Sequence, residues 1–121
     1  MPEKFVAKLS EFEDGERRIV FVGDNEIGVF RHDGEFYAYS NFCLHQGGPA
    51  CEGIIRSKVV DLFDAERKFL GQTYDDDEPH IVCPWHGWEY KLTTGECAPD
   101  PRFRLKRHDV VQRDGGVYVV I

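Results

Sequence analysis

Two short motifs, each containing one cysteine and one histidine, have a spacing that indicates metal chemistry. The first is Cys43-x-His45 and the second is Cys83-x-x-His86. Either pair can turn a thiolate and an imidazole toward one point from a single loop, so two loops together offer two sulfur and two nitrogen ligands. That set suits a tetrahedral zinc ion, or a two-iron cluster with two cysteines on one iron and two histidines on the other.

The residues around both motifs favour the two-iron cluster over zinc. A Gly-Gly-Pro segment at 47–49 follows the first pair, Pro84 lies inside the second and Gly87 comes directly after it. Glycines let backbone N–H groups approach inorganic sulfide, and such hydrogen bonds tune the potential of a cluster. Prolines stiffen the loops, so that a redox change needs little reorganisation. The bulky Trp85 and Trp88 can exclude water, and we expect Trp88 to pack as core beneath the second loop.

The forms CLHQGG and CPWHGW resemble the paired motifs of the Rieske [2Fe–2S] proteins, and the strand pattern around them is similar along nearly the whole chain. The resemblance implies an all-β Rieske iron–sulfur domain of antiparallel sheets, with a small cluster-binding subdomain formed by two loops. It also implies a ligand set in which Cys43 and Cys83 bind the inner iron. His45 and His86 would bind the outer iron, near solvent, where an electron can leave for a partner.

The chain of 121 residues fits one domain, 1–121. Within it we place the cluster-binding loops near 41–53 and 80–90, and an insertion near 54–77. The insertion is a departure from the family, because many soluble members have about half as many residues between the two motifs. We see no internal repeat, low-complexity segment or linker that would divide the chain further.

Strand signals dominate outside the insertion. Apolar-rich runs at 18–22, 26–32 and 35–40 are separated by turn residues, with Asp33-Gly34 between the last two. A second run with the same character, 108–121, turns around Asp114-Gly115-Gly116. An Asp-Gly pair between two apolar runs is a strong signal for a β-hairpin. These segments therefore predict an antiparallel β domain with closely spaced hairpins.

The insertion itself is ambiguous. Its VVDLF segment, 59–63, favours a strand, while DLFDAERKFL, 61–70, could form about two helical turns. Both alternatives stay open. The acidic run 75–78 precedes Pro79 and predicts a solvated turn, or a docking patch for a basic partner.

Two departures from the respiratory members of the family bear on the redox potential. The resemblance implies that each loop of those members contains a further cysteine. In this chain Trp85 occupies the position of that cysteine in the second loop, and Cys51 lies too far along the chain to replace the one in the first loop. Trp88 stands where those members carry a hydroxyl that donates to the cluster. The resemblance therefore points to ferredoxin-type and oxygenase-type domains, at the lower part of a range of roughly −150 to +300 mV.

We accordingly expect a one-electron transfer protein that passes electrons from a reductase to an oxygenase or similar acceptor. Oxygenase large subunits carry a second domain with a mononuclear iron held by two histidines and a carboxylate. Among the 35 residues that follow the second motif here, His108 is the only histidine. The chain alone is therefore not expected to be an enzyme. One alternative is a cluster-bearing small subunit of a multi-component oxygenase or reductase, and another is a zinc-stabilised interaction module.

Charge and composition exclude several other classes. The net charge of −7 and the pI near 5.2 argue against nucleic acid or an anionic membrane as a partner, and favour docking onto a basic redox protein. The chain has neither a stretch of signal-peptide character at its start nor one of membrane-spanning length, so we expect a cytoplasmic protein. In that compartment we expect Cys51 and Cys97 to be free thiols. The histidines outside the motifs are expected to be ordinary surface residues: His32, His80 and His108.

Overall fold

Strands dominate the part of the chain that the structure describes. The computed structural model describes residues 3–42, 49–84 and 88–121, and over 56–61 and 74–77 it describes the backbone alone. The elements in chain order are β1 (Glu3–Lys8), the 3-10 helix η1 (Leu9–Glu11), β2 (Arg17–Val22), β3 (Asn25–His32), β4 (Glu35–Ser40), the 3-10 helix η2 (Ala50–Glu52), β5 (Ile54–Phe63), β6 (Phe69–Val82), β7 (Glu89–Lys91), β8 (Arg107–His108), β9 (Val110–Arg113) and β10 (Gly116–Val120). The predicted all-β class is confirmed. Neither helix among these elements has the length and apolarity that crossing a bilayer would require.

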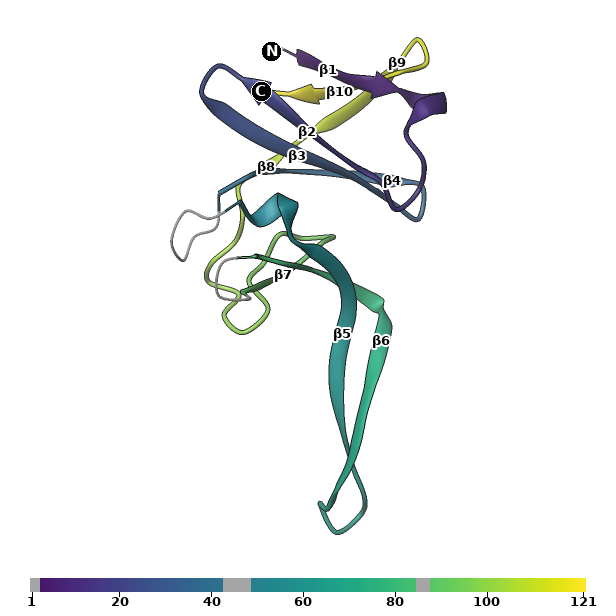
Figure 1. Cartoon of the computed structure of the whole chain (residues 1–121), viewed down its shortest axis with the longest axis vertical. Coiled ribbons are helices and arrows are strands. Elements are labelled where there is room, and N and C mark those ends of the chain that lie inside the picture. The colour runs from purple at the N-terminus through teal and green to yellow at the C-terminus, as the bar shows by residue number, and fades with distance from the viewer. Residues whose placement is uncertain (1–2, 43–48, 85–87) are drawn as a thin grey trace.

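The strands form three antiparallel sheets (Figure 1), with the strand orders β1-β10-β9, β2-β3-β4-β8 and β5-β6-β7. In the view of Figure 1 the first sheet lies at the top with both termini, and the four-stranded sheet lies below it. The third sheet lies at the far side of the four-stranded sheet and includes the long pair β5–β6. The four-stranded sheet is therefore the middle layer of the molecule.

Both faces of the middle sheet are covered by core. Side chains alternate along a strand, so the neighbours Val29 and Phe30 of β3 pack on opposite faces. The core on the Val29 side also contains Ala7, Phe12, Ile27, Ala38 and Val119. The core on the Phe30 side also contains Tyr39, Ala50, Cys51, Ile81, Cys83, Tyr90, Leu92, Cys97 and Leu105. This second core, which we call the loop-side core, includes residues from the described ends of both predicted ligand loops.

Tight turns form at both Asp-Gly pairs, as predicted. Asp33 and Gly34 join β3 to β4 with φ angles of 51° and 79°, and Asp114 and Gly115 join β9 to β10 with φ angles of 50° and 75°. Two successive positive φ angles characterise the type I′ turn, whose twist matches that of the strands it connects. Glycine at the second position adopts this conformation without a clash from a Cβ atom.

The insertion forms a two-stranded arm in which β5 pairs with β6 (Figure 1). The pairing runs from Ile54–Val82 at the base to Phe63–Phe69 at the tip. The strand alternative is therefore confirmed and the helical one is wrong. The cause is a chain reversal, because the Asp64 carboxylate accepts hydrogen bonds at 2.9 Å from the backbone N–H groups of Glu66 and Lys68.

The solvated turn predicted at 75–78 is also wrong, because these residues lie within β6. The pairing register jumps there: Ser57 pairs with Pro79, whereas Lys58 pairs with Asp75. Residues 76–78 of β6 are therefore unmatched on β5. Extra residues on one strand bend it and relieve the demand for a continuous ladder, which explains why this segment tolerates Pro79.

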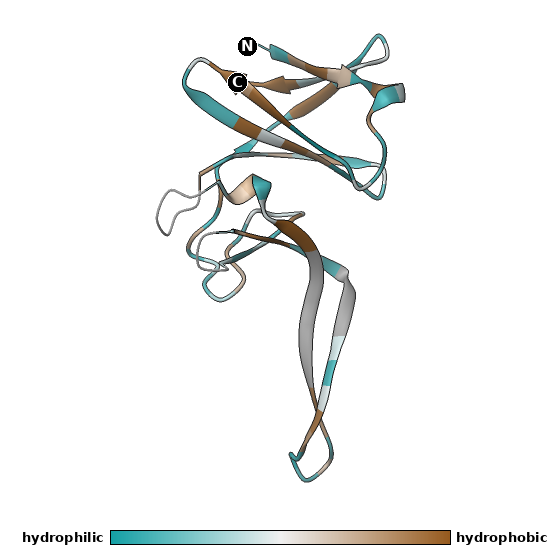
Figure 2. Cartoon of the chain, in the orientation of Figure 1, coloured by the Kyte–Doolittle hydropathy of each residue, from teal (hydrophilic) through white to brown (hydrophobic). Residues whose placement is uncertain are grey.

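The tip of the arm is apolar and exposed. Phe63 and Phe69 lie across from each other with ring centroids 5.9 Å apart. Leu62 and Leu70 are exposed beside them. Figure 2 shows this apolar stretch in brown near the end of the arm, just before the hydrophilic turn and far from the body. The arm contributes nothing to either core at this end, so the body of the protein is complete without the tip.

Candidate metal centre

The second predicted ligand loop begins where β6 ends. Cys83 follows Val82, the last residue of β6, and its side chain is buried in the loop-side core. Its backbone N–H donates a hydrogen bond of 2.7 Å to the carbonyl oxygen of Trp88, one residue before β7 begins. This bond closes the loop at its base. Trp88 packs against the loop-side core, which confirms its prediction, while His86 lies outside the described residues.

The first predicted ligand loop is closed by a side chain. Asn41 is 8% exposed, and its Oδ1 accepts a hydrogen bond of 2.8 Å from the backbone N–H of Cys51. Its Nδ2 donates to carboxylate oxygens of Glu26 at 3.0 Å and Glu52 at 3.4 Å. Asn41 therefore joins the residues on either side of the loop to each other and to β3. The ligands predicted within it, Cys43 and His45, lie outside the described residues.

We expect Asn41→Ala to lower the free energy of unfolding by about 1–3 kcal/mol, because it leaves the buried N–H of Cys51 without its partner. Urea denaturation monitored by tryptophan fluorescence measures the change. Asn25→Ala is the matched control, since Asn25 is an exposed asparagine on β3. Equal stability of both variants would contradict the closing role of Asn41.

The described ends of the two loops meet. A Cβ atom at Gly53 would lie 1.6 Å from the carbonyl oxygen of Val82 and 3.2 Å from the backbone nitrogen of Cys83. Ile54 also pairs with Val82, and Cys51 and Cys83 lie in the same core. Arg17 holds this junction from β2, since its guanidinium donates to the carbonyl oxygens of Cys51, at 2.7 Å, and Gly53. The fold thus brings together segments thirty residues apart in the sequence.

The cysteines differ in what they can bind. The structure describes Cys51, Cys83 and Cys97, and none of these three forms a disulfide, in line with the prediction for Cys51 and Cys97. Burial raises the pKa of the Cys51 thiol to about 12, and its Sγ donates to the carbonyl oxygen of Tyr39 at 3.4 Å. Cys51 is therefore a protonated core residue at neutral pH, not a thiolate ligand. Cys83 instead lies where the second loop begins, and its backbone is beside Gly53, which follows the first loop.

This arrangement fits a cluster held by both loops. A buried cysteine at the mouth of one loop has its backbone beside Gly53, which leads out of the other loop. Soft sulfur donors in an apolar environment suit iron–sulfur chemistry. Among the described residues no three or more histidine, cysteine, aspartate or glutamate side chains are arranged so that they could hold a metal ion, and three of the four predicted ligands fall outside these residues.

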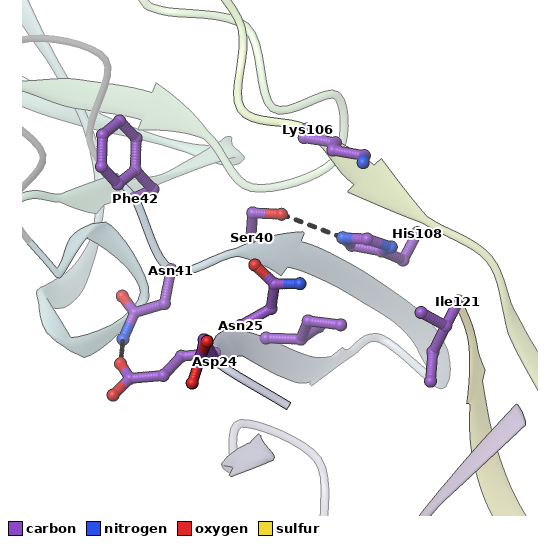
Figure 3. A pocket seen from close by; sticks show the side chains of 10 residues that line it. Asp24, Asn25, Ser40, Asn41, Phe42, Lys106, His108 and Ile121 are labelled. Atoms are coloured by element: carbon purple, nitrogen blue, oxygen red, sulfur yellow. Dashed lines mark hydrogen bonds between the residues drawn. The ribbon is translucent and has the colours of Figure 1, made fainter. Parts of the chain in front are cut away.

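A pocket of about 520 Å³ lies beside the described edge of the first loop (Figure 3). Phe42, the residue before Cys43, lines it together with Ser40 and His108. The Ser40 hydroxyl and His108 Nε2 are 2.9 Å apart. Burial, with a smaller contribution from Lys106, holds the pKa of His108 below its usual value. His108 is therefore a neutral residue that fastens β8 to β4.

His80 is not the surface residue that the sequence predicted. It is 4% exposed, and its ring nitrogens lie 2.9 Å from a carboxylate oxygen of Glu78 and 3.1 Å from one of Glu89. Sequence reasoning missed this cluster, and it also missed Arg17 and Asn41. Glu78-x-His80 is a local signal for part of the cluster, because alternate residues of a strand share a face. The contribution of Glu89 comes from β7 and depends on the pairing of strands.

Comparisons with known proteins identify the relatives of this chain. The model of the Rieske [2Fe-2S] domain family matches residues 3–109. A "Rieske domain-containing protein" of Homo sapiens is 34% identical, over 96% of this chain and 73% of that protein. The "3-phenylpropionate/cinnamic acid dioxygenase ferredoxin subunit" of Photorhabdus laumondii is 30% identical, over 100% of this chain and 96% of that protein. A chain from the complex of reduced oxygenase and oxidized ferredoxin in carbazole 1,9a-dioxygenase has a TM-score of 0.69 and 28% identity, over 98% of this chain and 92% of that chain.

Proposed function

Because the chain belongs to the Rieske [2Fe–2S] domain family, we propose that it is a one-electron carrier between redox proteins. The observation that carries the proposal is the similarity to a dioxygenase ferredoxin subunit along the whole of this chain and almost the whole of that one. When bound, the cluster supplies reversible one-electron chemistry, and the protein supplies its ligands, its surroundings and its docking surface.

The proposed ligands are Cys43 and Cys83 for the inner iron, and His45 and His86 for the outer iron. Cys83 is buried in the loop-side core, as a ligand on the protein side of a cluster would be. Tyr39 and Tyr90 are also in that core and are fully buried, so they exclude water from the core side of Cys83. A low-dielectric environment disfavours added negative charge, which supports a potential in the lower part of the Rieske range.

We assign the donor as a reductase and the acceptor as an oxygenase or similar terminal component. The names of two relatives support this, since one is a dioxygenase ferredoxin subunit and the other is a chain in a complex of oxygenase and ferredoxin. The proposal places the protein in the cytoplasm. Its described cysteines support that compartment, because none of the three forms a disulfide.

A tightly held subunit of an oxygenase remains the alternative to a mobile carrier, and association distinguishes the two. A mobile carrier exchanges electrons in short encounters, whereas a subunit purifies together with its catalytic chain. Purification from the native cell at moderate salt, followed by sedimentation velocity of the pure protein with its reductase, separates these cases. A carrier sediments separately from the reductase while still being reduced by it.

Electron transfer to a basic acceptor provides the direct test of the carrier function. With a net charge of −7, the protein reduced under anaerobic conditions should deliver one electron to ferricytochrome c, a positively charged acceptor. The second-order rate constant should fall as salt rises, because attraction between opposite charges is screened. Ferricyanide, a negatively charged acceptor, is the control and should show the opposite salt dependence. Transfer of two electrons, or of none, would contradict the proposal.

A further inference from the structure

Four ionisable side chains form a continuous series of contacts beside the second ligand loop. Glu89 contacts His80 at 3.1 Å, and His80 contacts Glu78 at 2.9 Å. Glu78 in turn contacts Lys91 Nζ at 3.5 Å through its other carboxylate oxygen. We call these four residues the loop-base cluster. Two members come from β6 and two from β7, and their signs alternate along the chain of contacts.

The imidazole of His80 is the centre of this cluster. Both of its ring nitrogens face carboxylate oxygens, which accept hydrogen bonds, so the ring that satisfies both carries two N–H groups and a positive charge. Pairing with two carboxylates makes a buried position tolerable for His80, since an unpaired buried charge is strongly destabilising.

The position of the cluster gives it a consequence for the metal centre. His80 is three residues before Cys83, and Glu89 is the first residue after Trp88. The Cys83–Trp88 hydrogen bond therefore closes the ligand loop immediately beyond the His80–Glu89 contact. Glu78 belongs to the unmatched residues 76–78 of β6, where the arm leaves the body. His80 thus joins the base of the arm to the residue that follows the loop.

We propose that His80 is a positioning residue for the second ligand loop: as an imidazolium it ties Glu78 to Glu89 and so holds Cys83 and Trp88 at a fixed separation. The purpose of this arrangement, which is to position a cluster ligand, rests on the proposed function. The contacts of His80 belong to the protein chain itself and do not depend on it. A loop fixed in this way keeps its ligands in place when the electron count changes, which limits reorganisation.

The test uses His80→Phe, which retains a planar ring but donates no hydrogen bond, and Glu89→Gln, which keeps the shape of the side chain. The double variant combines them. His32→Phe is the matched control, because His32 also lies beside a carboxylate, that of Asp33 at 3.5 Å, but at the end of β3 and outside the cluster. Hydrogen–deuterium exchange of the Cys83 amide is the first readout, and it works with or without a bound cluster.

We expect the Cys83 amide to exchange about tenfold faster in His80→Phe than in the wild-type protein, and at the wild-type rate in His32→Phe. Without His80, the carboxylates of Glu78 and Glu89 are like charges that have lost the cation between them. Glu89→Gln removes one of these charges, so the double variant should exchange more slowly than His80→Phe alone. A role in filling space alone would give no such rescue.

A second readout is the loss of iron to a chelator from the loaded protein, together with its EPR line shape. We expect faster loss of iron and a broader EPR spectrum in His80→Phe, with partial rescue in the double variant.

Unchanged Cys83 exchange in both single variants, or exchange in the double variant equal to the product of the single effects, would overturn the proposal. If His80→Phe does not fold, Glu89→Gln alone decides through the same two readouts. A wild-type protein that binds no cluster would refute the proposed function, while the exchange result would still decide the role of His80.

Discussion

Replacing Cys83 with serine is expected to give a folded protein without visible colour, in which bound iron and acid-labile sulfide fall to background. Serine is nearly isosteric with cysteine, but its hydroxyl does not replace a thiolate as a soft ligand for iron. Cys83 is 1% exposed and lies at the mouth of the second loop, directly after β6. Absorbance spectroscopy and iron analysis of protein assembled under anaerobic conditions measure the effect.

Cys97→Ser is the matched control for this experiment. Cys97 is also 1% exposed and lies in the same core as Cys83, but the ligand set does not include it. Both replacements therefore introduce one hydroxyl into the same apolar environment. We expect Cys97→Ser to keep its colour. Colour retained by Cys83→Ser, or lost equally by both variants, would count against Cys83 as a ligand.

Gly53→Ala is expected to have the largest effect on stability. The new Cβ would lie 1.6 Å from the Val82 carbonyl oxygen and 2.5 Å from its carbonyl carbon, and neither backbone atom can move without displacing the second loop. We expect the free energy of unfolding to fall by about 3–5 kcal/mol, in the range of severe core substitutions. The cluster should be lost as well, because the junction between the loops must open.

Urea denaturation, followed by fluorescence, measures this change. The control is Gly23→Ala, where a new Cβ meets nothing within 4 Å but φ is +62°. That substitution should lower the stability by only about 1–2 kcal/mol, the ordinary energy of placing alanine in a left-handed conformation. Comparable losses in both variants would show that Gly53 matters for its backbone flexibility and not for the contact between the loops.

The parts of the fold that follow from local sequence could be predicted. The Asp33-Gly34 and Asp114-Gly115 turns depend on residues that adopt positive φ angles, and their hairpins form where expected. The cluster ligands could likewise be proposed from spacing within each motif. Local signals were enough for the turns because a turn involves residues close in the chain, and the ligand pairs were proposed on the same kind of signal.

The remaining features depend on contacts between distant segments. The arm could not be predicted because its 61–70 segment suits a helix as well as a strand, and the reversal at Asp64 decides between them. The sequence around His80 predicts an ordinary surface histidine, because its contact with Glu89 depends on the pairing of β6 with β7. Asn41 holds Cys51 ten residues away, a pairing that no periodicity reveals. These cases share one cause: the partner is chosen by tertiary structure.

Pulsed EPR on the dithionite-reduced protein tests the central claim most directly, with a second sample in which histidine is labelled with ¹⁵N. The claim is that two cysteines and two histidines from separate loops hold one two-iron cluster. The account predicts a paramagnetic signal coupled to two histidine nitrogens, with couplings that change on labelling and an average g value below that of a cluster with cysteine ligands only. A signal without nitrogen coupling, or a colourless protein without any signal, would contradict it.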